Sequence, residues 1–169
     1  MSREQPQGEF LIEPATERDV PVLLRMIEGL AEYERLSHLV AATEEGLRAA
    51  LIGPRPAAEA IIARAGDEAI GFAVYFPTFS TFAGRPGIYL EDLYVEPHWR
   101  RRGVGRKLLA YVARVAAARG CDKLHWSVLD WNEPALRFYR RLGAEPVTDW
   151  VGYGLAGEAF SRLARESSD

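Results

Sequence analysis

The most constraining feature of this sequence is the direct succession of an apolar strand, a basic loop and an amphipathic helix across residues 88–120. The strand "IYLEDLYV" precedes the loop "EPHWRRRGVGR", which contains two glycines two residues apart. Apolar side chains then recur at helical spacing, at Val104, Leu108, Val112 and Val115. A strand that passes into a helix through a short loop is the repeating unit of sheets flanked by helices. The pattern predicts an α/β protein.

The rest of the chain extends this alternation. Strands are expected at residues 10–13, 59–65, 69–76, 123–129 and 147–155, and the second and third of these would form a hairpin that turns at Gly66-Asp67. Helices are expected after Thr16, which can form a capping box with Asp19, from Thr43 to about Gly53, at residues 132–142 and at residues 160–163. Asn132 is the expected N-cap of the third of these helices. We interpret residues 78–87, "TFSTFAGRPG", as a loop. The first eight residues and the final "ESSD" are expected to be disordered.

Length, charge and composition limit the class of protein. The 169 residues suffice for one domain with a substantial core. The sequence has neither a membrane-length apolar run nor the N-terminal pattern of a signal peptide, so we expect a cytoplasmic protein without a membrane partner. Cys121 is the only cysteine, which excludes an internal disulfide. The formal net charge of -3 argues against a general nucleic-acid binder, so the basic loop is a local feature.

The basic loop lies where a helix can bind an anion. Amides in the first turn of a helix lack intrahelical partners, and the aligned peptide dipoles make this end positive. Gly103 and Gly105 would let phosphate oxygens approach the backbone, while the arginines and Lys107 add positive charge. The loop therefore suits a pyrophosphate. The alternative from these residues alone is a plain turn with solvated arginines.

Other motifs are excluded by their spacing. A Walker loop ends in Gly-Lys-Ser or Gly-Lys-Thr, which is absent, and the dinucleotide fingerprint needs a third glycine where Leu108 stands. His38, His98 and His125 are scattered without metal-ligand spacing, so no metal is expected. Cys121 follows a helix C-terminus, where the dipole does not favour a reactive thiolate.

The basic loop and several further segments resemble one family of enzymes. "RRRGVG" resembles the acetyl-coenzyme A signature of the GNAT N-acetyltransferases, Arg/Gln-x-x-Gly-x-Gly/Ala. "LAEYE" at residues 30–34, "YLEDLYV" at 89–95 and "WNEPALRFYRRLGA" at 131–144 resemble the diamine (spermidine/spermine) acetyltransferase branch. The resemblance implies a single domain over residues 1–169, with a core at about residues 10–165. Its fold would be an α/β GNAT fold, with a single mixed central sheet of splayed parallel strands flanked by helices.

The resemblance also implies that acetyl-CoA is the cosubstrate and lies in the opening between the splayed strands. Backbone groups of Leu93, Tyr94 and Val95 would bind its pantetheine arm and polarise the thioester carbonyl. The basic loop would wrap the pyrophosphate through Arg100, Arg101, Arg102, Gly103, Val104, Gly105 and Arg106. The turn formed by Asn132, Glu133, Pro134 and Ala135 would contact the far side of the arm. Because the family often forms dimers, a homodimer is expected.

Two residues are candidates for proton transfer. Tyr139 matches the family's tyrosine that donates a proton to the departing thiolate, a role that suits a phenol because it stays protonated at neutral pH. The alternative is that Tyr139 only packs beside Phe138. Glu91 is the candidate base, because an amine is cationic at pH 7 and must lose a proton before it attacks. On an alternating strand Glu91 would share a face with Leu93 and Val95, and Asp92 would point the other way with Tyr94. The alternative for Glu91 is that it only attracts the cation.

The resemblance implies an amine substrate but leaves its identity open. Tyr33 and Glu34 match residues that contact the amine in the diamine branch, Asp92 supplies a further acid, and Trp126 would form part of the cleft wall. The polyamine enzymes carry acidic residues at the positions of Ser80 and Val151, and this chain has neither. A shorter amine therefore fits better, such as a lysine-like or thialysine-like side chain or a small diamine.

Three functions follow from these residues. The first is acetyl-CoA-dependent acetylation of a small primary amine by direct transfer in a ternary complex. The second is acetylation of a protein N-terminus or lysine, which would need a wider cleft. The third is a non-catalytic module that senses acetyl-CoA, and the presence of both Tyr139 and Glu91 beside the loop favours an enzyme over it.

Overall fold

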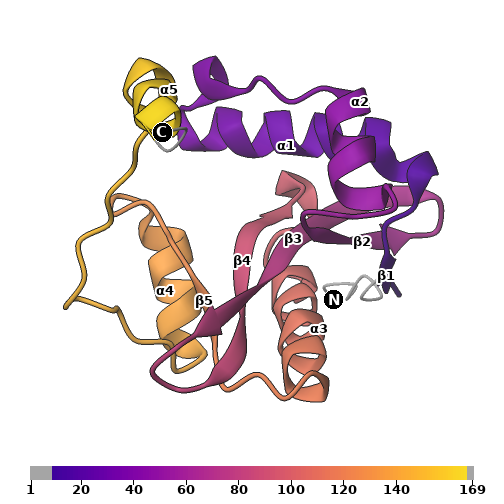
Figure 1. The fold of residues 1–169 in the computed structure, drawn as a ribbon. Coiled ribbons are helices and arrows are strands. Elements are labelled where there is room, and N and C mark those ends of the chain that lie inside the picture. The colour runs from indigo at the N-terminus through magenta and orange to yellow at the C-terminus, as the bar shows by residue number, and fades with distance from the viewer. Residues whose placement is uncertain (1–8, 167–169) are drawn as a thin grey trace, which may run out of the picture. The chain divides into compact units, whose positions relative to one another are not determined.

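The computed structural model describes residues 9–166, which form two compact units. The first unit ends at Leu129 and the second begins at Asp130 (Figure 1). The disorder expected for the first eight residues and for residues 167–169 lies outside the described residues. Glu166, the first residue of "ESSD", is the last residue of a helix, so disorder there is not observed.

The first unit is built on a five-stranded sheet in the order β1-β2-β3-β4-β5. Its strands are β1 (Leu11–Pro14), β2 (Glu59–Ala65), β3 (Glu68–Ser80), β4 (Arg85–Val95) and β5 (Leu124–Trp126). The first four strands pair antiparallel, whereas β5 pairs parallel to β4. Within residues 9–129, the α-helices that accompany them are α1 (Val20–Glu34), the short α2 (Glu44–Leu47), which a π-helical segment at Arg48–Ile52 continues, and α3 (Val104–Ala118). The mixed α/β architecture expected from the sequence is confirmed.

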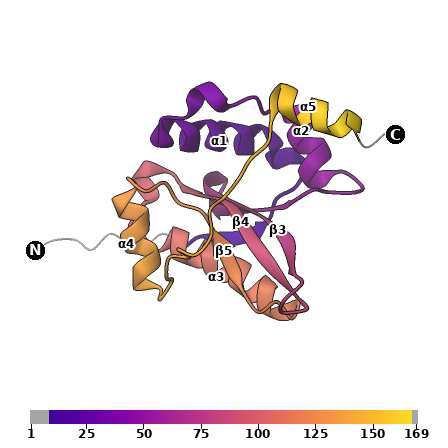
Figure 2. The ribbon, with the colours of Figure 1, turned by 60° about the vertical axis from the view of Figure 1, so that its left-hand side comes forward.

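Helices α1 and α3 cover opposite faces of this sheet (Figure 2). On one face, Leu23 and Met26 of α1 pack in a buried cluster with Phe72, Val74 and other apolar side chains of the strands. On the other face lie the buried residues of α3, including Leu108, which approaches Gly71 of β3. The burial of these side chains at helical and strand spacing explains why the apolar pattern of the sequence placed both elements correctly.

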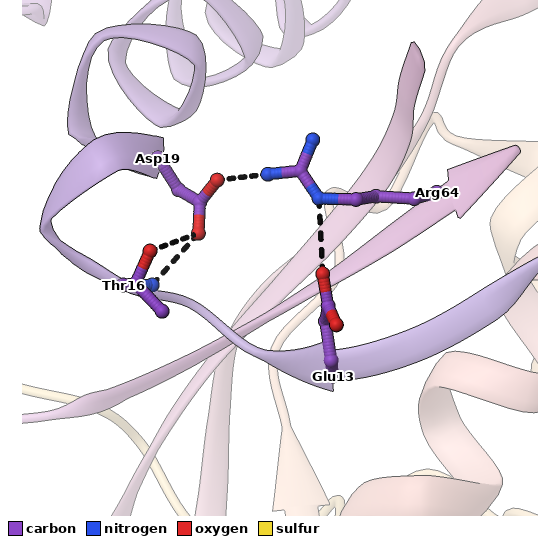
Figure 3. Close-up of polar contacts among 4 residues, drawn as sticks. All are labelled: Glu13, Thr16, Asp19 and Arg64. Atoms are coloured by element: carbon purple, nitrogen blue, oxygen red, sulfur yellow. Dashed lines mark hydrogen bonds and ion pairs between the residues drawn. The ribbon is translucent and has the colours of Figure 1, made fainter. Parts of the chain in front are cut away.

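The start of α1 is attached to the sheet by a polar cluster of Glu13, Thr16, Asp19 and Arg64 (Figure 3). The Asp19 carboxylate accepts hydrogen bonds from the Thr16 backbone N–H at 2.7 Å and from the Thr16 hydroxyl at 2.9 Å. It also pairs with Arg64 of β2, which donates a further bond to Glu13 of β1 at 3.1 Å. Asp19 is buried, so these partners satisfy a charge that would otherwise be costly. The capping box expected at Thr16 and Asp19 is confirmed.

Two of the elements expected in the first unit differ from the structure. Residues 78–87 are not a loop, because β3 and β4 continue as a hairpin in which Ser80 pairs with Arg85. Only residues 81–84 form the turn, and Gly84 has the positive φ of 61° that such a turn requires. The strand expected at 123–129 is reduced to β5, because its pairing with β4 stops at Trp126. Residues 78–87 show that prolines and glycines near a hairpin tip do not by themselves end a strand.

The second unit contains α4 (Glu133–Arg141) and α5 (Gly157–Glu166). The strand expected at residues 147–155 is wrong for the described part of the chain, where this segment is not part of a sheet. A strand needs a partner for its backbone groups, and the apolar alternation of the sequence carries no information about that partner. Its large apolar side chains are instead exposed, including Trp150 and Tyr153.

Candidate active site

The central feature of the candidate site is an open edge on β4. Residues Ile88, Leu90 and Tyr89 of β4 pair with Leu124–Trp126 of β5. Beyond Leu90, β4 continues to Val95 without a β5 partner among the described residues. The pairing of these two parallel strands stops after Leu90 of β4 and Trp126 of β5, as expected for splayed strands. The backbone of Leu93, Tyr94 and Val95 therefore lies along an edge of β4 that β5 does not cover.

A β-bulge on β4 lies where this opening begins. Asp92 is opposite Val74 and Leu90 is opposite Tyr75, so Glu91 is the extra residue between two regular pairs. The expectation that Glu91 shares a face with Leu93 and Val95 assumed regular alternation, and the bulge interrupts that alternation at Glu91 itself. Asp92 and Tyr94 share a face of the sheet, because their partners Val74 and Phe72 are two residues apart in a regularly paired part of β3. The Glu91 side chain is exposed and that of Asp92 is largely covered.

Asp92 and Glu34 are perturbed carboxyls on the α1 side of the sheet. Burial, and then the nearby charges of Glu91 and Glu34, raise the pKa of Asp92 to about 6. Burial also raises the pKa of Glu34, which is the last residue of α1. All the influences on Asp92 disfavour its charge, and no cation is among them. A substrate cation near these carboxylates would relieve this cost, so the pair is suited to binding an amine.

The basic loop has the conformation expected for an anion site. Gly103 is the N-cap of α3 and has a φ of 84°, while Arg101 has a φ of 62°. A Cβ built on Gly103 would lie in open space, so the backbone here is accessible from outside. The first helical bond runs from the Lys107 N–H to the Gly103 carbonyl at 3.0 Å, which leaves the amides of Val104, Gly105 and Arg106 without helical partners. These residues fit a pyrophosphate group.

The basic side chains of the loop are used in different ways. The Arg100 guanidinium lies 4.8 Å from the ring centroid of Tyr33 and 5.8 Å from that of Tyr94. Arg102 lies 5.0 Å from the ring of Trp99, and Lys107 lies 4.6 Å from that of Phe10. Cation–π contacts of this kind fix the side chains but leave their charge unneutralised. The loop therefore keeps positive charge next to the exposed amides.

Two further candidate residues lie on the strands. Ser80 is the last residue of β3, and its hydroxyl accepts a hydrogen bond from the Ala83 N–H at 3.2 Å within the hairpin turn. Trp126 is the last residue of β5 and lies opposite Leu90, where the pairing of β4 and β5 ends. Trp126 is thus placed beside the opening, whereas Ser80 belongs to the tip of the β3–β4 hairpin.

The second unit carries the remaining candidates. Asn132 is the N-cap of α4, and its side-chain oxygen accepts a bond from the Ala135 N–H at 3.3 Å. Pro134 occupies the first turn, and Glu133 pairs with Arg137 at 3.7 Å. Tyr139 is half-buried on α4, and its ring lies 5.1 Å from that of Phe138. The cap expected at Asn132 is confirmed, and the roles of Asn132 and Tyr139 in the reaction remain predictions.

The contacts within the first unit bring Tyr33, Glu34, Asp92 and Arg100 together.

Sequence reasoning missed two features of this site. It did not find the bulge at Glu91, although two adjacent acids inside an apolar strand are an unusual pattern that could have indicated it. It also grouped Arg100 with the phosphate-binding residues, whereas the structure directs its side chain to Tyr33 and Tyr94. No signal in the local sequence specifies this contact, because Tyr33 and Arg100 are far apart in the chain.

An uncovered strand edge that leads into a glycine-containing basic loop at a helix N-terminus is the arrangement of a protein suited to a ligand with a pyrophosphate group. Comparison with known proteins agrees with this description. The model of the acetyltransferase (GNAT) family matches residues 24–144. The thialysine N-epsilon-acetyltransferase of Sus scrofa is 41% identical over 165 residues, which cover 91% of this chain and 96% of that protein. The chain therefore belongs to the GNAT acetyltransferase family and is an N-acetyltransferase.

Other matches agree with this assignment. The human spermidine/spermine N(1)-acetyltransferase-like protein 1 is 28% identical over 160 residues, which cover 90% of this chain and 23% of that protein. The resemblance to the diamine branch is thereby confirmed. The solved structure of an integron cassette protein from V. cholerae has a TM-score of 0.77 and 25% identity, and covers 92% of this chain and 98% of its own. Members of the GNAT family use acetyl-CoA as the acetyl donor.

Two features are absent from the part of the chain that the structure describes. None of the helices within residues 9–166 has both the length and the apolar character needed to cross a membrane. The same residues contain no group of three or more His, Cys, Asp or Glu side chains arranged to hold a metal ion.

Proposed function

We propose that this chain transfers the acetyl group of acetyl-CoA to the terminal amine of a small lysine-like molecule, by direct transfer in a ternary complex. The observation that carries the proposal is the open edge of β4, which has an anion-binding loop at its end and the carboxyls of Glu34, Glu91 and Asp92 beside its start. This arrangement suits a donor with a pyrophosphate and an acceptor with a positive charge.

The donor would be held mainly by backbone groups. The amides of Val104, Gly105 and Arg106 would bind the pyrophosphate, with added charge from Arg101, Arg102 and Arg106. The edge of Leu93, Tyr94 and Val95 would take the pantetheine arm as an additional strand-like partner. The turn formed by Asn132, Glu133, Pro134 and Ala135 would contact the other side of this arm. Acetyl-CoA supplies the acetyl group as a thioester, and the residues of the chain supply its orientation and the proton transfers.

The proton transfers would be divided between two residues. Glu91 would accept the proton that a cationic amine must lose, and its exposed position at the bulge would allow a water molecule to relay it. The neutral amine would then attack the thioester carbonyl carbon, forming the C–N bond. As the C–S bond breaks, Tyr139 would donate its phenolic proton to the departing thiolate, and the second proton that the attacking nitrogen loses would restore the phenol. Asp92, with Glu34 and Tyr33, would attract and orient the amine.

The proposed substrate is a short amine rather than a long polyamine. The thialysine acetyltransferase of Sus scrofa, named for a lysine analogue, is similar over nearly its whole length. The position of Ser80 in the hairpin turn provides no carboxylate for a second distant cation. Trp126, at the end of the β4–β5 pairing, would form part of the wall around the aliphatic portion of the substrate.

The assembly and location are also proposals. We infer that residues 1–169 act as one acetyltransferase domain and that two copies form a homodimer in the cytoplasm. The segment around Trp150 and Tyr153 supports the dimer, because its large apolar side chains are exposed in the single chain and its sequence has the alternation of a strand. We propose no metal, nucleic-acid or membrane partner.

A thiol-release assay with acetyl-CoA tests this function directly. The amines should include thialysine, lysine, ornithine, putrescine and spermidine, together with a peptide that carries a lysine and a free N-terminus. We expect the highest kcat/KM for a lysine-like amine. Preference for the peptide would favour a protein acetyltransferase. Tight acetyl-CoA binding by calorimetry without turnover of any acceptor would instead favour a sensor and refute the proposed function.

A further inference from the structure

Arg100 is the first arginine of the basic loop, yet its side chain turns back toward α1. Its Nε donates a hydrogen bond to the carbonyl of Val95, the last residue of β4, at 2.9 Å. Its guanidinium lies over the rings of Tyr33 and Tyr94, at 4.8 Å and 5.8 Å from their centroids. One side chain thus contacts the end of β4, the face of the sheet and the last turn of α1.

The contact partners of Arg100 are themselves closely packed. A Cβ built on Gly29 of α1 would lie 2.8 Å from the Tyr94 hydroxyl oxygen, so only a glycine lets the helix approach this ring so closely. Tyr94 is buried, and its hydroxyl donates to a Glu96 carboxylate oxygen at 3.3 Å. Tyr94 is therefore a fixed platform, and Arg100 rests between this platform and the more exposed ring of Tyr33.

The last turn of α1 is the part of the helix that Arg100 contacts through Tyr33. Arg35 ends the helix in the left-handed conformation with a φ of 62°, and its N–H donates to the Glu32 carbonyl at 3.1 Å, so this turn is closed by a single cap residue. Tyr33 and Glu34 lie in this turn, and Glu34 is one of the two charges that act on Asp92. A shift of the helix end would therefore move both a ring and a carboxylate of the proposed amine site.

We infer that Arg100 is a positioning residue for the proposed amine site. It holds Tyr33 and the end of α1 against β4, and it thereby connects the amine site to the basic loop. This inference rests on the proposed function and revises the expectation that Arg100 binds the cofactor. Because the guanidinium is engaged by two rings and a carbonyl, the pyrophosphate would be bound by the loop amides and by other side chains, such as Arg106.

Steady-state kinetics of Arg100→Gln and Arg106→Gln test the division between the two residues. Loss of a half-buried cation–π contact should raise KM for the amine by roughly tenfold in Arg100→Gln, with the coenzyme A affinity measured by calorimetry within about twofold of the parent. Arg106→Gln should show the opposite pattern. A larger loss of coenzyme A affinity than of amine affinity in Arg100→Gln would overturn the inference.

A double-mutant cycle with Tyr33→Leu tests whether Arg100 acts through Tyr33. If it does, the effects of Arg100→Gln and Tyr33→Leu on the amine KM should not add, and the double variant should resemble the more damaged single variant. Additive effects would refute the connection. If Arg100→Gln does not fold, Arg100→Lys replaces it, because it keeps the charge but lacks the flat group that lies between two rings. A smaller rise in amine KM alone is then expected, and equal changes for both substrates would contradict the inference.

Hydrogen exchange distinguishes failure of this inference from failure of the proposed function. The amides of residues 31–35 should exchange faster in Arg100→Gln than in the parent, whether or not any amine is acetylated. If the parent acetylates no amine but these amides still respond, the proposed function fails and the positioning contact stands. If the parent is active and these amides are unchanged, the positioning role is refuted.

Discussion

Asp92→Asn should make the protein more stable at pH 8 and less active. The wild-type carboxyl is largely covered on the α1 face of β4, where burial, Glu91 and Glu34 all raise its pKa. The folded protein therefore disfavours the ionised form that predominates in the unfolded chain at neutral pH. Asparagine keeps nearly the same shape and removes the charge. The same change would remove an acid from the proposed amine site, so stability and activity should move in opposite directions.

The size and the pH dependence of this effect follow from the pKa. A value of about 6 in place of the ordinary 3.8 corresponds to a loss of up to about 3 kcal/mol of folding free energy once Asp92 is ionised. The pKa of Asp92 is higher in the folded than in the unfolded protein. Its protonated carboxyl therefore costs no folding stability below pH 3.8, and this stability is lost as the pH rises to about 6 and above. We expect Asp92→Asn to exceed the parent by about 1 to 3 kcal/mol at pH 8, because relaxation of the site reduces the upper limit.

Urea unfolding of the parent and of Asp92→Asn at pH 4.5, 6 and 8 measures this difference. Glu32→Gln is the matched control, since it removes an exposed carboxyl from the last turns of α1 and should change stability by less than about 0.5 kcal/mol at each pH. The gap between Asp92→Asn and the parent should grow from pH 4.5 to pH 8. The reasoning is refuted if the difference in unfolding free energy between Asp92→Asn and the parent does not change with pH. It is also refuted if Asp92→Asn is less stable than the parent at pH 8.

Three further predictions concern the acetyl transfer. Gly103→Asp should weaken coenzyme A binding by more than tenfold in calorimetry, and Gly103→Ala should weaken it less, because both strain a backbone with a φ of 84° but only aspartate adds a repelling charge. Equal coenzyme A affinities of Gly103→Asp and Gly103→Ala would show that charge repulsion is not the cause of the loss. Tyr139→Phe should lower kcat by roughly ten- to a hundred-fold with little change in the amine KM, and a rate within twofold of the parent, with chemistry rate-limiting, would leave the acid unassigned. Ser80→Asp should raise kcat/KM for spermidine relative to putrescine several-fold, since it offers a carboxylate to the additional nitrogen, and an unchanged ratio would place Ser80 outside the pocket.

Much of the fold was predictable because its signals are local. The capping box at Thr16, the cap at Asn132 and the glycine at the start of α3 each specify a helix boundary through residues within one turn. The hairpin of β2 and β3 was also found from alternation and from Gly66. The segment at 147–155 failed for the opposite reason, since a strand is defined by a partner that the local pattern cannot specify.

The geometry of the candidate site was less predictable than its composition. Glu91 and Asp92 were both identified, but their orientation depends on the register of β4 against β3, where one residue is left over at the bulge. The role of Arg100 depends on a contact with a ring on α1, which sequence spacing does not reveal. Motifs thus indicated the residues of the candidate site, and long-range pairing decided what the side chains of Glu91, Asp92 and Arg100 contact.

The separation of charge within the first unit links these observations. Arg100 is the first arginine after the end of β4. An ion pair between Arg100 and Asp92 or Glu34 would neutralise the proposed amine site. Its guanidinium instead lies over Tyr33 and Tyr94, and no cation is among the groups that act on Asp92. The rings therefore stabilise the arginine without consuming a carboxylate. A cationic substrate would then be the group that relieves the cost of ionising Asp92, which converts a loss of folding stability into affinity for an amine.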